Sequence, residues 1–171
     1  MLGYIVATKT QSANATIAEV SRRLLAQGIN VVGACQINDD PNDGTPYHMD
    51  LHTIPKGQVI RISQSLGPLA SGCRLDPAAL EQAVGIAAAQ VATGPDFLIA
   101  NKFGKQEAEG RGFRPVVAEA LGNGVPVLLA VRDETLPSFE AFTDGIGQEL
   151  PNDVAVVLAW AQATLAEMGQ A

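Results

Sequence analysis

The sequence predicts an α/β protein in which helices cover both faces of a largely parallel sheet, forming a three-layer sandwich. Short apolar runs alternate along the chain with longer segments whose apolar residues recur at helical spacing. The run Val125–Val131 is apolar throughout, as expected for a strand that is covered on both faces. The 171 residues contain no repeat, low-complexity tract or interdomain linker, so we expect a single domain over residues 1–171.

The composition narrows the classes of function. Hydrophobic residues make up 47% of the chain and charged residues 17%, which is typical of a globular protein. The net charge of -7 argues against general binding to nucleic acid or to an anionic membrane. There is no apolar run long enough for a transmembrane helix. The first residues, Met1–Ala7, have no basic region before their apolar run, so they predict a strand and not a signal peptide. We therefore expect a cytoplasmic protein.

The N-terminal third predicts one βαβ unit. A strand at Leu2–Ala7 is followed by a polar loop, a helix from about Ala15 to Gln27, and a second strand at Asn30–Gln36. Asn14 is the predicted N-cap of the helix, and Gly28 is the predicted left-handed residue just after its end.

The next region predicts a small inserted β-hairpin. A strong turn signal occupies Asp39–Gly44. Two short β-compatible runs follow, Tyr47–Thr53 and Gln58–Ser63, separated by Ile54–Gly57. We expect this hairpin to lie at the edge of the main sheet.

The rest of the chain alternates between helices and strands. Asp76 is the predicted cap of a helix that begins with proline. The predicted elements are a helix from Pro77 to about Ala92, a strand at Asp96–Ala100, a helix from about Phe113 to Leu121, a strand at Val125–Val131, a short helix at Ser138–Phe142 and a last helix at Asn152–Met168.

This architecture predicts where a ligand would bind. Right-handed crossovers place the strand-to-helix loops along one edge of a parallel sheet, and ligands bind outside the carboxyl ends of its strands. The loops after Ala7, Gln36 and Ala100 are therefore expected to converge on one edge.

The loop that follows Ala100 is the strongest candidate for an anion site. Four of the eleven Lys and Arg residues fall between Asn101 and Arg114. Its glycines permit tight backbone geometry, and arginine offers forked donors for oxyanions. Glu107 and Glu109 could instead neutralise these bases, so a salt-bridged surface loop is the alternative. The candidate anion-binding residues of this loop are Asn101, Lys102, Lys105, Arg111 and Arg114.

The loop after Ala7 stands where a phosphate-binding P-loop would stand. Lys9, Thr10, Ser12 and Asn14 could bind phosphate or another oxyanion beside the N-terminus of a helix. The loop has no glycine and does not match G-x-x-x-x-G-K-[ST]. An ordinary polar loop that caps a helix is the alternative.

Arg74, just before a predicted helix, could point toward the same edge. Cys73 could be a reactive thiol, although a buried cysteine is the commoner case. The spacing of Cys35, Cys73, His48 and His52 fits no standard zinc site. The two histidines share a strand face, but a solvated hairpin is the simpler interpretation. We assign no metal-binding residue.

One long segment carries a family resemblance. The run Leu98–Gly112 (LIANKFGKQEAEGRG), with Gly72–Asp76 (GCRLD) before it and Gly124–Leu128 (GVPVL) after it, resembles the bacterial DUF2478 family over nearly the whole chain. The resemblance implies a P-loop-NTPase-like fold, because family members look like relatives of P-loop nucleoside triphosphatases. Some members are associated with molybdate transport genes.

The sequence departs from a working nucleoside triphosphatase. The Walker A glycines and the Lys-Ser/Thr pair are missing, and Asn101 stands where a Walker B strand would deliver an aspartate for magnesium. We therefore assign no catalytic residue and favour a binding protein for an oxyanion such as molybdate, tungstate or phosphate. The alternatives are a divergent nucleotide-binding triphosphatase that uses magnesium, and a regulatory or assembly module. The expected partner is a small anionic ligand, and the composition also allows a homo-oligomer.

Overall fold

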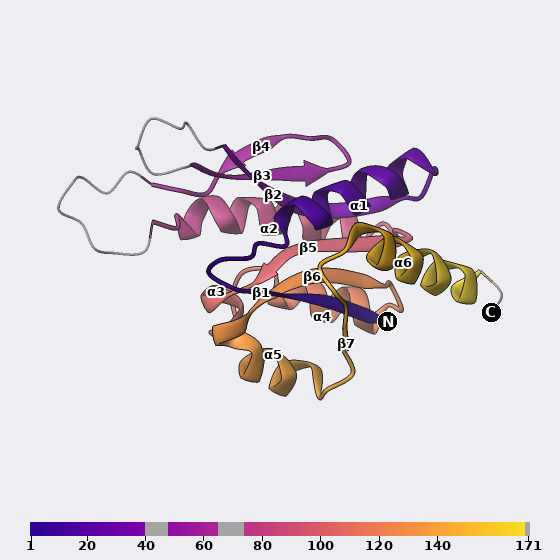
Figure 1. The fold of residues 1–171 in the computed structure, drawn as a ribbon. Coiled ribbons are helices and arrows are strands. Elements are labelled where there is room, and N and C mark those ends of the chain that lie inside the picture. The colour runs from indigo at the N-terminus through magenta and orange to yellow at the C-terminus, as the bar shows by residue number, and fades with distance from the viewer. Residues whose placement is uncertain (40–47, 65–73, 170–171) are drawn as a thin grey trace.

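A seven-stranded sheet forms the centre of the molecule (Figure 1). The computed structural model describes residues 1–39, 48–64 and 74–169. The strands in this part of the chain are Leu2–Ala7 (β1), Val31–Asp39 (β2), His48–Ile54 (β3), Val59–Arg61 (β4), Phe97–Phe103 (β5), Val127–Arg132 (β6) and Gln148–Glu149 (β7). They lie in the order β4-β3-β2-β5-β6-β1-β7. The pairs from β2 to β7 are parallel, and β3 and β4 join antiparallel at one edge. The predicted α/β class and the hairpin at the edge are confirmed.

Helices cover both faces of this sheet (Figure 1). They are Asn14–Ala26 (α1), Pro77–Val91 (α2), Lys105–Ala108 (α3), Arg114–Gly122 (α4), Leu136–Thr143 (α5) and Val154–Met168 (α6), with a short 3-10 turn at Asp133–Thr135 (η1). Leu98 belongs to the core under α2, α4 and α5, whereas Ile99 belongs to the core under α1 and α6. Because successive strand residues point to opposite faces, a continuous apolar strand supplies both cores.

Two of the three capping residues predicted for the helices are confirmed, and one is wrong. Asp76 caps α2 by accepting hydrogen bonds from the N–H groups of Ala78 and Ala79, as predicted. Gly28 follows the end of α1 with a φ of +81°, also as predicted. The assignment of Asn14 as N-cap is wrong, because it is the first helical residue and its N–H donates to the hydroxyl of Ser12.

The strand β5 is longer than predicted and changes the setting of two candidate residues. Asn101 and Lys102 belong to β5, not to the loop beyond it, because buried Phe103 pairs with Val131 and prolongs the strand. The strand β2 likewise continues past Gln36, since its pairing with β3 extends to its last residue. The two-residue strand β7 was not predicted.

No helix in the described ranges is long and apolar enough to cross a membrane. The turn predicted after Asp39 and the thiol of Cys73 lie outside the described residues. Cys35 is buried in the sheet with a free thiol, and burial raises its pKa.

Candidate anion-binding site

The register of three parallel strands brings the candidate residues to the edge of the sheet that is formed by the carboxyl ends of its strands. Ala7, the last residue of β1, lies opposite Arg132 at the end of β6. Lys102 on β5 lies opposite Ala130, two residues before Arg132. The loop after β1 therefore begins beside the two strand ends that carry Lys102 and Arg132.

A β-bulge in β5 sets the positions of Asn101 and Lys102. Ala100 pairs with Leu129 and Lys102 pairs with Ala130, so Asn101 is an extra residue in the ladder. A bulge of this kind bends the strand and redirects its side chains, and bulges are common beside active sites. The Asn101 amide is 4% exposed and donates a hydrogen bond of 3.4 Å from Nδ2 to Oε1 of Gln36 on β2.

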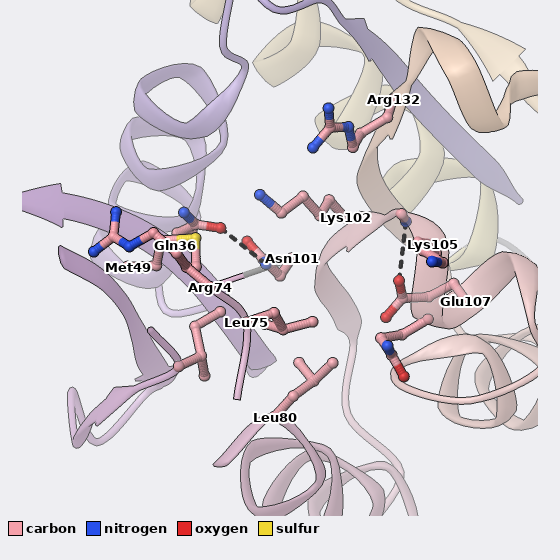
Figure 2. Close-up of a pocket in the computed structure, with 13 residues that line it drawn as sticks. Gln36, Met49, Arg74, Leu75, Leu80, Asn101, Lys102, Lys105, Glu107 and Arg132 are labelled. Carbon is pink, nitrogen blue, oxygen red and sulfur yellow. Dashed lines mark hydrogen bonds between the residues drawn. The ribbon is translucent and has the colours of Figure 1, made fainter. Parts of the chain in front are cut away.

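Two adjoining cavities open at this edge, each of about 300 Å³. We call the first the cationic cleft; it lies between the loop after β1 and the ends of β2, β5 and β6, and its polar lining includes Lys9, Ser12, Asn14, Asn38, Lys102 and Arg132. We call the second the amphipathic pocket; its lining includes Arg74, Leu75, Leu80, Asn101, Lys102, Lys105 and Arg132 (Figure 2). Gln36, Met49, Lys102 and Arg132 line both.

Lys102 is the cation at the centre of this arrangement. Its side chain is half-buried, and among the described residues its ammonium group makes no ion pair or hydrogen bond. Burial and the nearby charge of Arg132 lower its pKa, while Glu107 opposes the shift. A bound anion would stabilise the charged form of Lys102.

Arg132 points toward the same open space as Lys102 (Figure 2). One of its nitrogens, Nη2, lies 2.9 Å from Oε1 of Glu134. A guanidinium has five N–H donors, so this ion pair leaves others for a ligand. Arg132 is not among the residues predicted from the sequence. It directly follows the predicted strand Val125–Val131, so the rule that drew attention to Asn101 would also have found it.

Glu107 has a structural role in the segment Leu98–Gly112, which carries the family resemblance. Its buried carboxylate, 5% exposed, accepts hydrogen bonds from the N–H groups of Gly104 at 2.9 Å and Phe113 at 3.1 Å. Gly112 has a φ of +58°, and a Cβ there would lie 2.1 Å from Oε1 of Glu107. Burial raises the pKa of Glu107, against the lowering effect of these N–H groups and Lys102. The carboxylate thus ties the two ends of the loop together.

Arg111 lines neither cavity. It donates from Nε to Oε1 of Gln106 at 2.9 Å and forms a close ion pair with Glu109. The salt-bridged loop considered as the alternative therefore describes this residue. Lys105 does line the amphipathic pocket, where it is exposed and lies 4.0 Å from Glu109.

Arg114 and Thr10 also lie outside both cavities. The Arg114 guanidinium packs 4.6 Å from the ring centroid of Phe142 and donates to the carbonyl of Glu107 at 3.4 Å. The Thr10 hydroxyl lies 3.3 Å from that of Thr8. The structure thus brings together seven of the ten predicted anion-binding residues, on the linings of two cavities: Lys9, Ser12, Asn14, Arg74, Asn101, Lys102 and Lys105.

The loop after β1 does not form a phosphate cradle of the Walker type. The N–H of Thr8 donates to the carbonyl of Gln11 at 3.0 Å, and the N–H of Gln11 donates to the Thr8 hydroxyl at 3.1 Å. These donors are used inside the loop. Asn101 carries an amide where a Walker B strand carries the acid for magnesium. The described residues contain no group of three His, Cys, Asp or Glu side chains that could hold a metal.

The fold places the protein in a known structural class. A human cancer-related nucleoside triphosphatase solved in solution aligns with a TM-score of 0.63 at 15% identity, over 99% of this chain and 98% of the other. THEP1 from the hyperthermophile Aquifex aeolicus aligns with a TM-score of 0.65 at 13% identity, over 96% and 99% of the two chains. The molecule therefore has the fold of the P-loop nucleoside triphosphatases. By sequence, the chain belongs to the family described as "Protein of unknown function (DUF2478)", whose model matches residues 2–160.

A longer relative carries a functional name. The chain is 36% identical over 152 residues to "Molybdenum import ATP-binding protein ModC 2" of Bradyrhizobium diazoefficiens. The match covers 89% of this chain but only 17% of the relative.

Proposed function

We propose that this protein binds a tetrahedral oxyanion in the cationic cleft, with molybdate, tungstate and phosphate as the candidate ligands. The observation that carries the proposal is that two cationic side chains, Lys102 and Arg132, line the same cleft at the carboxyl ends of the parallel strands. Lys102 forms no ion pair among the described residues, and Glu107, the acid that acts on its charge, already accepts two backbone N–H groups. An oxyanion pairs with the charge of Lys102, and the fork of an arginine suits its geometry.

The loop after β1 supports the proposal from the other side of the cleft. Lys9 and Ser12 line the cleft and are exposed, so both can turn toward a ligand. The hydroxyl of Ser12 accepts from the N–H of Asn14 and keeps its own hydrogen for an anion. Because the protein as a whole carries a net charge of -7, selective anion binding depends on such a local cluster of donors.

Molybdate and tungstate stand first among the ligands because of the relative that is named for molybdenum import. That name belongs to a much longer protein, so it suggests a ligand and does not assign one.

A divergent nucleotide-binding triphosphatase is the second candidate. The fold and the words "ATP-binding" in the relative's name favour it. The loop after β1, whose N–H groups at Thr8 and Gln11 form hydrogen bonds within the loop, and the amide of Asn101 argue against hydrolysis. This second candidate predicts magnesium-dependent phosphate release from a nucleotide. A purified preparation that releases none above background contradicts it.

Isothermal titration calorimetry with molybdate, tungstate, phosphate and sulfate tests the leading proposal. We expect at least one of these anions to bind the unaltered protein. Lys102→Met should weaken that binding by about tenfold or more, the equivalent of about 1.4 kcal/mol. Arg111→Ala is the matched control, because Arg111 lines neither cavity and its loss should leave the affinity unchanged. Absence of binding by all four anions contradicts the proposal.

A further inference from the structure

The amphipathic pocket has two walls of opposite character. The charged side carries the cations Lys102 and Arg132, which it shares with the cationic cleft, and the carboxylate of Glu107, which accepts two backbone N–H groups. On the other side are aliphatic side chains from β3, from the residue after β4, from the segment before α2 and from α2 itself: Met49, Ile62, Leu75 and Leu80. Figure 2 shows Met49, Leu75 and Leu80 among them. The pocket thus continues the anion site into an apolar chamber.

This chamber exceeds the needs of a free oxyanion. Its volume of about 300 Å³ lies at the lower end of the range for small-molecule sites. A hydrated anion gains nothing from aliphatic side chains and loses solvation against them. An apolar group placed there gains about 25 cal/mol for each Å² of surface removed from water.

Asn101 supplies the lining of the pocket with a hydrogen-bond acceptor that is unused among the described residues. Its amide is buried and makes one hydrogen bond, through Nδ2 to Gln36, so its Oδ1 accepts none from the described residues. Gln36, only 2% exposed, lies beside it and lines both cavities.

We infer that the oxyanion recognised here is carried on an organic ligand, a phosphate monoester whose compact, largely apolar group occupies the amphipathic pocket. The inference rests on the proposed function, because Lys102 and Arg132 hold the oxyanion in both. It adds that the aliphatic wall around Leu75 selects for the group esterified to that oxyanion.

Calorimetry with three probes tests the inference: inorganic phosphate, phenyl phosphate and glycerol 2-phosphate. The two esters have similar charge and differ in the polarity of the group they carry. We expect phenyl phosphate to bind at least about tenfold more tightly than either of the others, as burial of roughly 60 Å² of ring surface suffices for that ratio. Leu75→Gln should remove this advantage and leave the affinity for inorganic phosphate unchanged.

Two further variants separate the causes of any loss. Leu121→Gln changes a half-buried leucine of α4 that does not line the pocket, and it should retain the preference for phenyl phosphate. Lys102→Met should weaken all three probes together. Far-ultraviolet circular dichroism checks that each variant is folded.

The outcomes distinguish this inference from the proposed function. Equal affinities for the three probes, or a preference that survives in folded Leu75→Gln, overturn the inference and leave the oxyanion site standing. Binding of phenyl phosphate that does not depend on Lys102 overturns both. If no phosphate probe and no inorganic oxyanion binds, the proposed function fails, and the inference fails with it.

Discussion

At the scale of single residues, the site depends on three influences on the charge of Lys102: burial, Arg132 and Glu107. Arg132 and burial disfavour its ammonium form, and Glu107 favours it. Glu107 is itself committed to the loop, where it accepts two backbone N–H groups. Arg132 in turn forms an ion pair with Glu134, so the site offers an anion the charge of Lys102, which is unpaired among the described residues, and the N–H donors of Arg132 that Glu134 does not use.

The lowered pKa of Lys102 predicts how anion binding depends on pH. Binding requires the charged lysine, so affinity should fall as the pH rises through the lowered pKa, before the ordinary value of 10.5 is reached. By linkage, the unfolded chain holds more protons in that window, so the free energy of unfolding contributed by Lys102 rises with pH across it. Calorimetry with molybdate, whose charge is constant above neutral pH, measures the affinity. Lys102→Arg should remove the alkaline loss; an identical loss in that variant contradicts the assignment.

Glu107→Gln should destabilise the protein. A glutamine can accept one of the two backbone N–H groups but meets the other with its own NH₂, which leaves a buried donor unsatisfied at a cost of about 1–3 kcal/mol. The exposed Glu109→Gln should change the free energy of unfolding little. Urea unfolding of both variants measures the difference. Equal stabilities would show that the buried carboxylate does not hold the loop.

The raised pKa of Glu107 adds a pH signature to this comparison. The folded protein holds more protons than the unfolded chain between the ordinary carboxyl pKa of 4.5 and the raised pKa of Glu107. The contribution of Glu107 to the free energy of unfolding therefore falls as the pH rises through that window. Glu107→Gln should lack this decline, and Glu109→Gln should keep it.

At the scale of elements, the sequence predicted most helices and strands but not how far they extend. The sequence predicted β5 at Asp96–Ala100, yet pairing with β6 carries the strand to Phe103. A bulge depends on the register between two strands, and nothing in the local sequence around Asn101 specifies it. The extension of β2 has the same origin, since its partner β3 lies in the inserted hairpin.

Two glycine substitutions test the packing of these elements. Gly33 in β2 has a φ of +116°, and a Cβ would lie 2.0 Å from the carbonyl oxygen of Ile99 in β5. Gly33→Ala should therefore lower the free energy of unfolding by at least about 2 kcal/mol. Gly85→Ala, in an exposed position of α2 with no heavy atom within 4 Å, should raise it by about 0.5–1 kcal/mol. Denaturant titration of both variants checks the signs, and a neutral Gly33→Ala contradicts the close approach of β2 and β5.

At the scale of the whole molecule, topology explains which candidate residues meet. The parallel order of β5, β6 and β1 brings Lys102, Arg132 and the loop after Ala7 to one edge, as the rule for such sheets predicted. The rule could not place Arg111 and Arg114, because they lie beyond the end of β5, where Arg111 turns toward Glu109 and Arg114 toward Phe142 of α5. The density of basic residues in the segment Asn101–Arg114 therefore predicted two anion-binding residues, Arg111 and Arg114, that line neither cavity.

The most direct test of the central claim is a crystal structure of the protein soaked in tungstate, with the tungsten located by its anomalous scattering. The claim predicts a peak in the cationic cleft, within ion-pair distance of Lys102 and Arg132, and its loss in Lys102→Met crystals. Peaks found only beside surface cations such as Arg111 or Lys56, with the cleft empty, would contradict it.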